Sequence, residues 1–172
     1  FSHRGIGLYD PRRDRFVPYR PSGALPEGYR QDLAMALHVD RQGNEWIGTA
    51  KGVFRRDPKG RWVRFVHREE DPSSLVNDYI TRFFEERNGR VWISSESAGA
   101  SVWTPGREGF ETVAHRKGDP RSLGSNNLFC LGETHEALWL GTQGGGLSRL
   151  DRRTGGLRTY GIRDGLPNEK IY

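Results

Sequence analysis

Three segments that begin with tryptophan recur along the chain: Trp46-Ile-Gly-Thr49, Trp92-Ile-Ser-Ser95 and Trp139-Leu-Gly-Thr142. The first two tryptophans are 46 residues apart, and the second and third are 47 residues apart. A fixed period of 20–50 residues is the sequence signature of a repeat architecture. Counting from the tryptophans divides the chain into four repeat units, of which the last is incomplete: 1–45, 46–91, 92–138 and 139–172.

Each unit contains the same order of short segments. A glycine followed by a strand-like segment comes six or seven residues after each tryptophan, then a turn rich in proline and glycine, then another short strand-like run. A polar loop follows, with one signature in two units, Asp71-Pro-Ser-Ser-Leu75 and Asp119-Pro-Arg-Ser-Leu123. The unit ends in a turn such as Arg87-Asn-Gly-Arg90, and Asn-Gly between two strand-like runs is a strong hairpin signal.

The unit therefore predicts four short strands and no helix. The segment Leu33–Val39 could form a helix in isolation, but its repeat partner Tyr79–Phe84 is β-branched and aromatic, so both are predicted to be strands. Four strands per 40–50 residues, with an aromatic motif in each copy, are typical of propeller blades. We expect an all-β fold, a β-propeller segment over residues 1–172 with about three and a half four-stranded blades.

Composition limits the class of partner. The 27 basic and 22 acidic residues give a net charge of +5, but the arginines stand beside aspartates, as at Asp10, Arg12, Arg13 and Asp14. Such mixing is typical of a solvated surface, so we expect no nucleic-acid partner. Cys130 alone excludes an internal disulfide. The longest apolar run, Leu33–Leu37, is far shorter than the ~20 residues of a membrane-spanning helix.

The repeated motifs resemble the two-component regulator propeller repeat. The resemblance rests on Trp-Ile/Leu-Gly-Thr, on Gly-Leu-x-Arg-Leu-Asp and on Asp-Pro-x-Ser-Leu, and it covers essentially the whole chain. The copy at 139–160 fits the pattern best. The copy that starts at Trp92 departs from it, because Ser94 and Ser95 replace Gly-Thr. We therefore expect the blade with these serines to carry a particular feature.

The resemblance implies a place and a function. Such repeats build large, often seven-bladed propellers outside the inner bacterial membrane, as the sensory part of hybrid histidine kinases and sometimes of diguanylate cyclases. The resemblance implies that this chain is a non-catalytic, periplasmic segment of a larger propeller ring. The parent protein is expected to be anchored in the inner membrane and to be a dimer. Its expected partners are the remaining blades and a small-molecule or oligosaccharide ligand, with no cofactor. The segment Asn168–Tyr172 is expected to begin a further innermost strand; otherwise the ring would close with four blades or pair with another chain.

Several residues have structural interpretations that outweigh functional ones. The repeated tryptophans are expected to pack between blades. His67 and His115 occupy the slot that Tyr160 fills in another unit, which predicts half-buried aromatic positions and not metal ligands. Asp71 and Asp119 are expected to begin turns before a proline. No catalytic set and no metal-ligand spacing is present in the sequence.

A ligand site is predicted on one face of the propeller. In a blade, the strand before the tryptophan lies innermost, so the loops that enter it and those that follow the tryptophan strand emerge on the same face. Loops on a rigid scaffold commonly carry binding residues. The candidate residues offer hydrogen-bonding groups suited to sugar hydroxyls or acidic sugars. They are Asp71, Asn77, Asp78, Glu96, Asp119, Asn126, Asn127, Gln143 and Arg163.

Two other functions remain open from the sequence. A propeller enzyme of the lyase or glycosidase type, acting on a polysaccharide or a lactone, would place converging carboxylates with shifted pKa values in the channel. A protein-docking scaffold would instead expose an apolar patch on one face.

Overall fold

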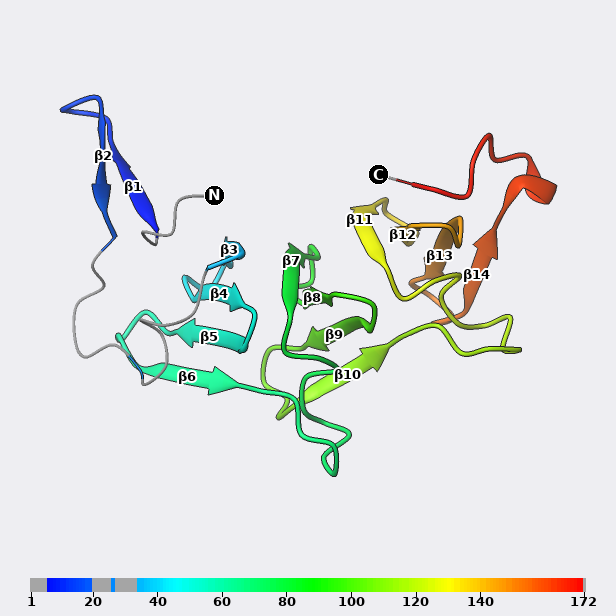
Figure 1. Ribbon diagram of the computed structural model, residues 1–172, viewed down its shortest axis with the longest axis horizontal. Helices are drawn as coiled ribbons and strands as arrows, with labels where there is room; N and C mark the ends of the chain where they lie inside the picture. The colour runs from blue at the N-terminus through cyan, green and yellow to red at the C-terminus, as the bar shows by residue number, and fades with distance from the viewer. Residues whose placement is uncertain (1–5, 20–25, 27–33, 172) are drawn as a thin grey trace.

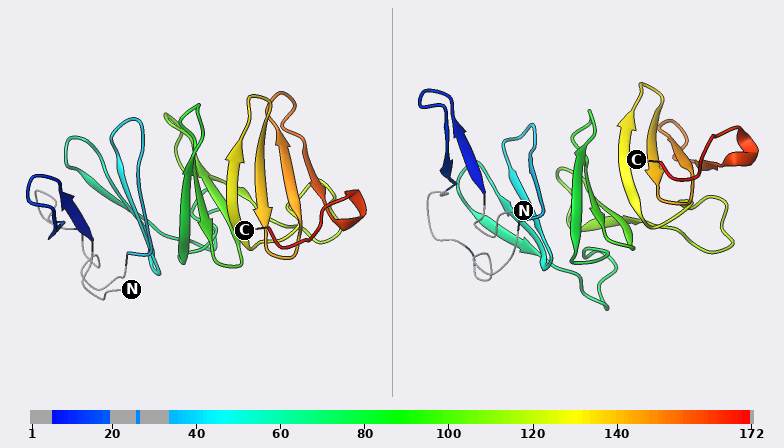
Figure 2. Two further views of the ribbon diagram at one scale, coloured as in Figure 1. Left: turned by 90° about the horizontal axis from the view of Figure 1, so that it is seen from above. Right: turned by 45° about the horizontal axis from the view of Figure 1, so that its top comes forward.

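The computed structural model describes residues 6–19, 26 and 34–171. These residues form three four-stranded antiparallel sheets and one two-stranded hairpin, arranged as an open arc (Figure 1). Figure 2 shows the sheets side by side, with the hairpin at one end of the arc and the C-terminal segment at the other. The predicted all-β propeller architecture is confirmed.

The strands follow one another in chain order within each sheet. We call the three sheets blades 1, 2 and 3. Blade 1 contains β3 (Ala36–Val39), β4 (Glu45–Thr49), β5 (Gly52–Arg56) and β6 (Trp62–Phe65); blade 2 contains β7 (Ile80–Glu85), β8 (Val91–Ser95), β9 (Gly99–Trp103) and β10 (Phe110–Val113); blade 3 contains β11 (Leu128–Glu133), β12 (Ala137–Thr142), β13 (Leu147–Asp151) and β14 (Leu157–Tyr160). The hairpin pairs β1 (Gly7–Asp10) with β2 (Arg15–Pro18), and the 3-10 helix η2 (Ile162–Asp164) follows blade 3.

Each blade begins with the strand that precedes a repeat tryptophan. The segment 36–39, which is helix-compatible in isolation, forms β3 as predicted, while Leu33 lies outside the described residues. β3 and β7 contact each other across the blades, which places the first strand of each sheet on the inner side of the arc. No helix among the described residues is long and apolar enough to span a bilayer.

Tight hairpin turns follow from aspartate or glutamate and glycine at fixed positions. After β3, the Gly43 amide donates to the Asp40 carbonyl at 2.8 Å, and the Asp40 amide donates to the Asn44 carbonyl at 3.0 Å. The turn after β7 has the same two bonds, and both turns place a glycine at positive φ, near +79° at Gly43 and +84° at Gly89. This is a type I turn closed by a left-handed residue, a common short hairpin loop.

Two apolar cores fill the spaces between blades. The first joins blades 1 and 2 and contains Trp46 and Trp103, and the second joins blades 2 and 3 and contains Trp92. Trp46 and Trp92 are fully buried, so their predicted packing role is confirmed. Trp139 is only partly buried, on the side of blade 3 that faces away from blade 2.

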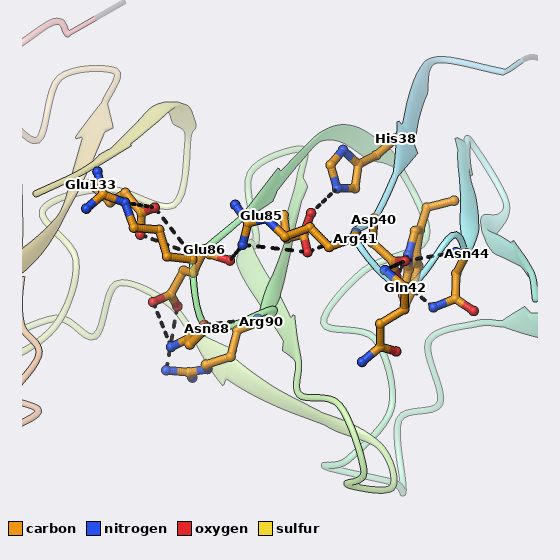
Figure 3. Close-up of polar contacts among 12 residues, drawn as sticks. His38, Asp40, Arg41, Gln42, Asn44, Glu85, Glu86, Asn88, Arg90 and Glu133 are labelled. Atoms are coloured by element: carbon orange, nitrogen blue, oxygen red, sulfur yellow. Dashed lines mark hydrogen bonds and ion pairs between the residues drawn. The ribbon is translucent and has the colours of Figure 1, made fainter. Parts of the chain in front are cut away.

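Polar contacts also join neighbouring blades, at the ends of the innermost strands. The amide of Arg41 donates to Glu85 Oε1 at 3.2 Å, and its Nη1 donates to the Glu86 carbonyl at 2.8 Å (Figure 3). One blade further on, the amide of Arg87 donates to Glu133 Oε1 at 3.2 Å, and the Arg87 Nε lies 3.2 Å from the same oxygen. The same arginine–glutamate contact therefore recurs at both blade interfaces.

The histidines His67 and His115 hold loops, but they are exposed and not half-buried as predicted. Each ring donates through Nδ1 to a loop carbonyl at 2.6 Å, that of Leu75 and that of Leu123 respectively. The side chains of Leu75 and Leu123 are themselves buried in the cores. Each histidine therefore fixes its Asp-Pro-x-Ser-Leu loop against the blades, while its ring remains exposed to solvent.

The C-terminal residues make the contacts of a further innermost strand, as predicted. The Gly146 amide donates to the Glu169 carbonyl at 2.9 Å, as the Gly99 amide does to the Asn126 carbonyl at 2.9 Å at the start of β11. Lys170 then forms a β-bridge with Gln143. In the described part of the chain this segment pairs with blade 3 and not with β1, so the arc is not closed as four blades.

Candidate ligand-binding site

A cavity of about 260 Å³ lies between blades 2 and 3, where the chain enters their innermost strands. It is on the face for which a ligand site was predicted. Three of the predicted residues, Glu96, Asn127 and Gln143, meet there although they are far apart in the sequence. The complete lining is Thr81, Arg82, Ser95, Glu96, Ser97, Asn127, Leu128, Phe129 and Gln143.

Two β-bulges shape the cavity. The register between β7 and β8 shifts between Ile80 and Arg82, and that between β11 and β12 shifts between Leu128 and Cys130. The extra residues are therefore Thr81 and Phe129, and both line the cavity. Bulges re-aim side chains and are common next to binding sites. Here they turn one side chain from each blade toward the same space.

The cavity combines an aromatic surface with polar groups. The guanidinium carbon of Arg82 lies 5.6 Å from the centre of the Phe129 ring, so a charged plane stacks on an apolar one. Glu96 and Gln143 are exposed at the rim, and among the described residues neither side chain accepts or donates a hydrogen bond. A carboxylate, an amide and a guanidinium thus line the same cavity, where they could form hydrogen bonds with a ligand.

The loop after β8 is held in a strained conformation beside the cavity. Ser97 has φ of +56°, which is uncommon for a residue other than glycine. Its hydroxyl donates to Asn127 Oδ1 at 3.0 Å, while the amide of Glu96 donates to the Tyr79 carbonyl at 3.0 Å. These bonds fix Glu96 and orient the amide nitrogen of Asn127 away from Ser97. Strained residues of this kind concentrate at functional sites.

The remaining predicted residues lie outside the cavity lining and support loops. Asp71 accepts the amide of Ser73 at 2.9 Å, and Asp119 accepts the amide of Arg121 at 2.9 Å, as predicted for residues that begin turns. Hydrogen bonds between Ser73 and the Asp71 carboxylate lower the pKa of Asp71. Asn77, Asp78 and Asn126 accept backbone amides through Oδ1, and Arg163 is exposed in η2.

Sequence reasoning missed Thr81, Arg82, Ser97 and Phe129 as cavity residues. No sequence signal marks a bulge, so Thr81 and Phe129 read as ordinary strand positions. Ser95 had a signal, since it lies where the other copies carry Thr49 and Thr142. Those threonines donate to the carbonyl of the following glycine, whereas Ser95 donates to the Asn77 carbonyl at 3.4 Å and lines the cavity.

The site shows no metal chemistry in the residues that the structure describes. They contain no group of three or more His, Cys, Asp or Glu side chains close enough to hold one ion.

The fold and part of the sequence match known proteins. Residues 74–97 match the two-component regulator propeller family. A comparison with curated protein sequences finds no match. Among solved structures, the extracellular domain of a putative hybrid two-component system from B. thetaiotaomicron is 22% identical, with a TM-score of 0.70 over 81% of this chain. A second such domain from the same species is 23% identical, with a TM-score of 0.63 over 92% of this chain.

This chain spans 20% of the length of each of these two domains. Virginiamycin B lyase from Staphylococcus aureus shares the fold at 16% identity, with a TM-score of 0.53, over 78% of this chain and 42% of the lyase. At these identities the likeness establishes the fold alone. Residues 74–97 thus match the two-component regulator propeller repeat, and the fold of the chain is that of a β-propeller segment.

Proposed function

We propose that this chain is a non-catalytic, ligand-sensing segment of the extracytoplasmic propeller of a bacterial two-component signalling protein, and that the cavity between blades 2 and 3 binds a carbohydrate. The convergence of Glu96, Asn127 and Gln143 beside the Arg82–Phe129 pair supports this most strongly. Sugar rings offer an apolar face and a rim of hydroxyls, which an aromatic ring flanked by amide and charged groups complements.

The same proposal assigns the further properties of the parent protein. It is anchored in the inner membrane with this segment in the periplasm, and other blades of the same chain complete the ring. Exposed apolar side chains on β1–β3, among them Phe16, Leu37 and Val39, fit a surface that packs against such blades. A ligand would act by binding one arrangement of blades, or of two protomers, more tightly than another.

The enzyme alternative has less support. A lyase or glycosidase mechanism needs paired acid and base groups, and the lining of this cavity contains one carboxylate, that of Glu96. The likeness to virginiamycin B lyase concerns the fold alone.

A glycan array probed with the intact protein tests the proposal, followed by calorimetric titration of the best-binding oligosaccharide. Gln143→Ala should weaken binding about tenfold, because it removes hydrogen bonds within the cavity. Gln42→Ala is the matched control, since Gln42 is exposed in the turn after β3, on the opposite face, and should leave the affinity unchanged. Equal affinity of both variants for the oligosaccharide would mean that it binds outside this cavity. If the intact protein binds no glycan on the array, the proposal that the ligand is a carbohydrate is wrong.

A further inference from the structure

The third residue of the tryptophan motif differs between the three blades. It is a glycine in blades 1 and 3, Gly48 and Gly141, and a serine in blade 2, Ser94. The three residues are equivalent, because each lies two residues after its repeat tryptophan, in the second strand of its blade. The serine therefore stands at the interface between blades 2 and 3, which also contains the candidate ligand cavity.

The two glycines allow close contact with the inner strand that follows. A Cβ on Gly48 would lie 2.9 Å from the Cβ of Ile80 and 2.5 Å from its Cγ2. A Cβ on Gly141 would lie 3.0 Å from the Cβ of Ile171 and 2.6 Å from its Cγ2. Side-chain carbons do not approach one another so closely, and a packed interior has no spare volume for an added methyl group. Any residue other than glycine at these two positions needs a wider spacing.

The residue that faces the third position also differs in blade 3. Ile80 and Ile171 each stand two residues after a carbonyl that accepts the amide of a glycine in the preceding blade. The same bond joins the Gly99 amide to the Asn126 carbonyl, so the corresponding residue is Leu128. Glycine thus faces isoleucine twice, and serine faces leucine once.

Ser94 therefore sets a wider spacing between blades 2 and 3. Because every residue other than glycine carries a Cβ, Ser94 and Leu128 cannot lie as close together as Gly48 and Ile80 do. The strands agree with this argument. β7 packs along β3 and β4 of blade 1, whereas β11 approaches β7 and β8 less closely.

The wider spacing coincides with the candidate cavity. Ser95, next to Ser94 in the chain, and Leu128, which faces it, are both part of the lining. Thr81, the bulged residue of β7, lines the cavity too, and its hydroxyl donates to the Ser94 carbonyl at 3.2 Å. Residue 94 thus contacts or adjoins the strands that form the cavity wall.

Packing alone does not explain a serine at this position. Ser94 is 1% exposed, and among the described residues its Oγ is buried without a hydrogen-bond partner. A buried hydroxyl without a partner is unfavourable for folding. Residues that break such a local rule are expected at functional sites. The Cβ of Ser94 widens the interface, whereas its hydroxyl makes no bond there.

We propose that Ser94 is a spacer, whose Cβ holds β8 and β11 apart and thereby keeps open the cavity between blades 2 and 3. It is a positioning residue, because it acts on binding through the width of the cavity. Its effect on affinity rests on the proposed function, but its effect on the spacing of the strands is independent of any ligand.

A crystal structure of the intact protein with Ser94→Gly and Leu128→Ile, determined without ligand, tests the spacing. This double variant recreates the pair of Gly48 and Ile80. The distance between the Cα atoms of residues 94 and 128 should shorten to that between residues 48 and 80 of the same molecule. Leu128→Ile alone keeps the serine and is the control, so it should retain the original distance. An unchanged distance in the folded double variant would overturn the proposal, whatever the protein binds.

Two single variants then separate the Cβ from the hydroxyl in binding. Ser94→Gly should weaken binding of the oligosaccharide selected on the glycan array about tenfold in calorimetric titration, because the cavity narrows. Ser94→Ala keeps the Cβ and should leave the affinity unchanged. Equal weakening in both variants would mean that the hydroxyl contacts the sugar, and unchanged affinity in folded Ser94→Gly would mean that the width does not matter. Either result contradicts a spacer that controls binding. Shortened spacing in a protein that binds no glycan would support the spacer and refute only the carbohydrate.

Discussion

In blades 1 and 2, a single carboxylate links the hairpin turn after the first strand to the core between blades. The Asp40 carboxylate accepts the Trp46 indole N–H and two N–H groups of Asn44, one from the backbone and one from the side chain, each at 2.8 Å. Glu86 accepts the Trp92 indole N–H in the next blade. A buried N–H without an acceptor costs free energy, so these acids allow a tryptophan to be completely enclosed.

Removing this acceptor should destabilise the chain well beyond a surface change. Asp40→Ala leaves the indole N–H of buried Trp46 and the Asn44 amide unpaired, and we expect the free energy of unfolding to fall by about 2–4 kcal/mol. Urea unfolding followed by tryptophan fluorescence measures it. Asp10→Ala is the control, because Asp10 accepts only exposed bonds, and it should cost less than about 1 kcal/mol. Similar losses in the two variants would show that the indole bond contributes little.

At the scale of elements, the loops between strands depend on close backbone contact. The loop 143–146 after β12 packs directly on Gly124, so closely that a side chain on Gly145 would lie 2.2 Å from the Gly124 carbonyl carbon and 2.4 Å from the Ser125 nitrogen. The three glycines at 144–146 therefore do more than allow the chain to bend. Gly145 brings this loop into contact with the loop that joins blades 2 and 3, beside Gln143.

The paired substitutions Gly145→Ala and Gly144→Ala separate contact from conformation. Gly145→Ala should lower the free energy of unfolding by about 3 kcal/mol, because backbone atoms must move apart. A side chain on Gly144 would meet nothing within 4 Å, so Gly144→Ala should cost only about 1–2 kcal/mol for its φ of +81°. Thermal unfolding ranks the two variants. A larger loss at Gly144 would mean that backbone conformation, and not the contact, limits this loop.

The strands could be predicted from the sequence because the tryptophan register repeats, and that register also identified the face with the candidate site. It could not show that Glu96, Asn127 and Gln143 meet around one cavity, since no sequence signal marks the bulges at Thr81 and Phe129 that shape it. The exposure of His67 could not be predicted from the sequence either. A ring that only donates to a loop carbonyl stands at the same position of the repeat as a packed tyrosine.

On the scale of the molecule, the blades interact as neighbours in a row. Blade 2 packs against a core on each side, and every residue of β8 and β9 is buried, whereas most residues of β1 are exposed. In such arrays, stability is approximately a sum of unit and nearest-neighbour terms. A perturbation at one interface should therefore weaken the two blades that form it more than the blade beyond.

Native-state hydrogen exchange should show this gradient directly. Amides of β8 and β9 should exchange most slowly and those of β1 and β2 fastest, because opening blade 2 disrupts both cores. Trp103→Ala removes a ring that lies 5.1 Å from Trp46 in the core between blades 1 and 2. It should accelerate exchange in β4, β5 and blade 2 while leaving β12 and β13 nearly unchanged. Equal acceleration in all three blades would instead mean that the described sheets open as one cooperative unit. The arginine–glutamate contacts would then couple neighbouring blades as strongly as the apolar cores do.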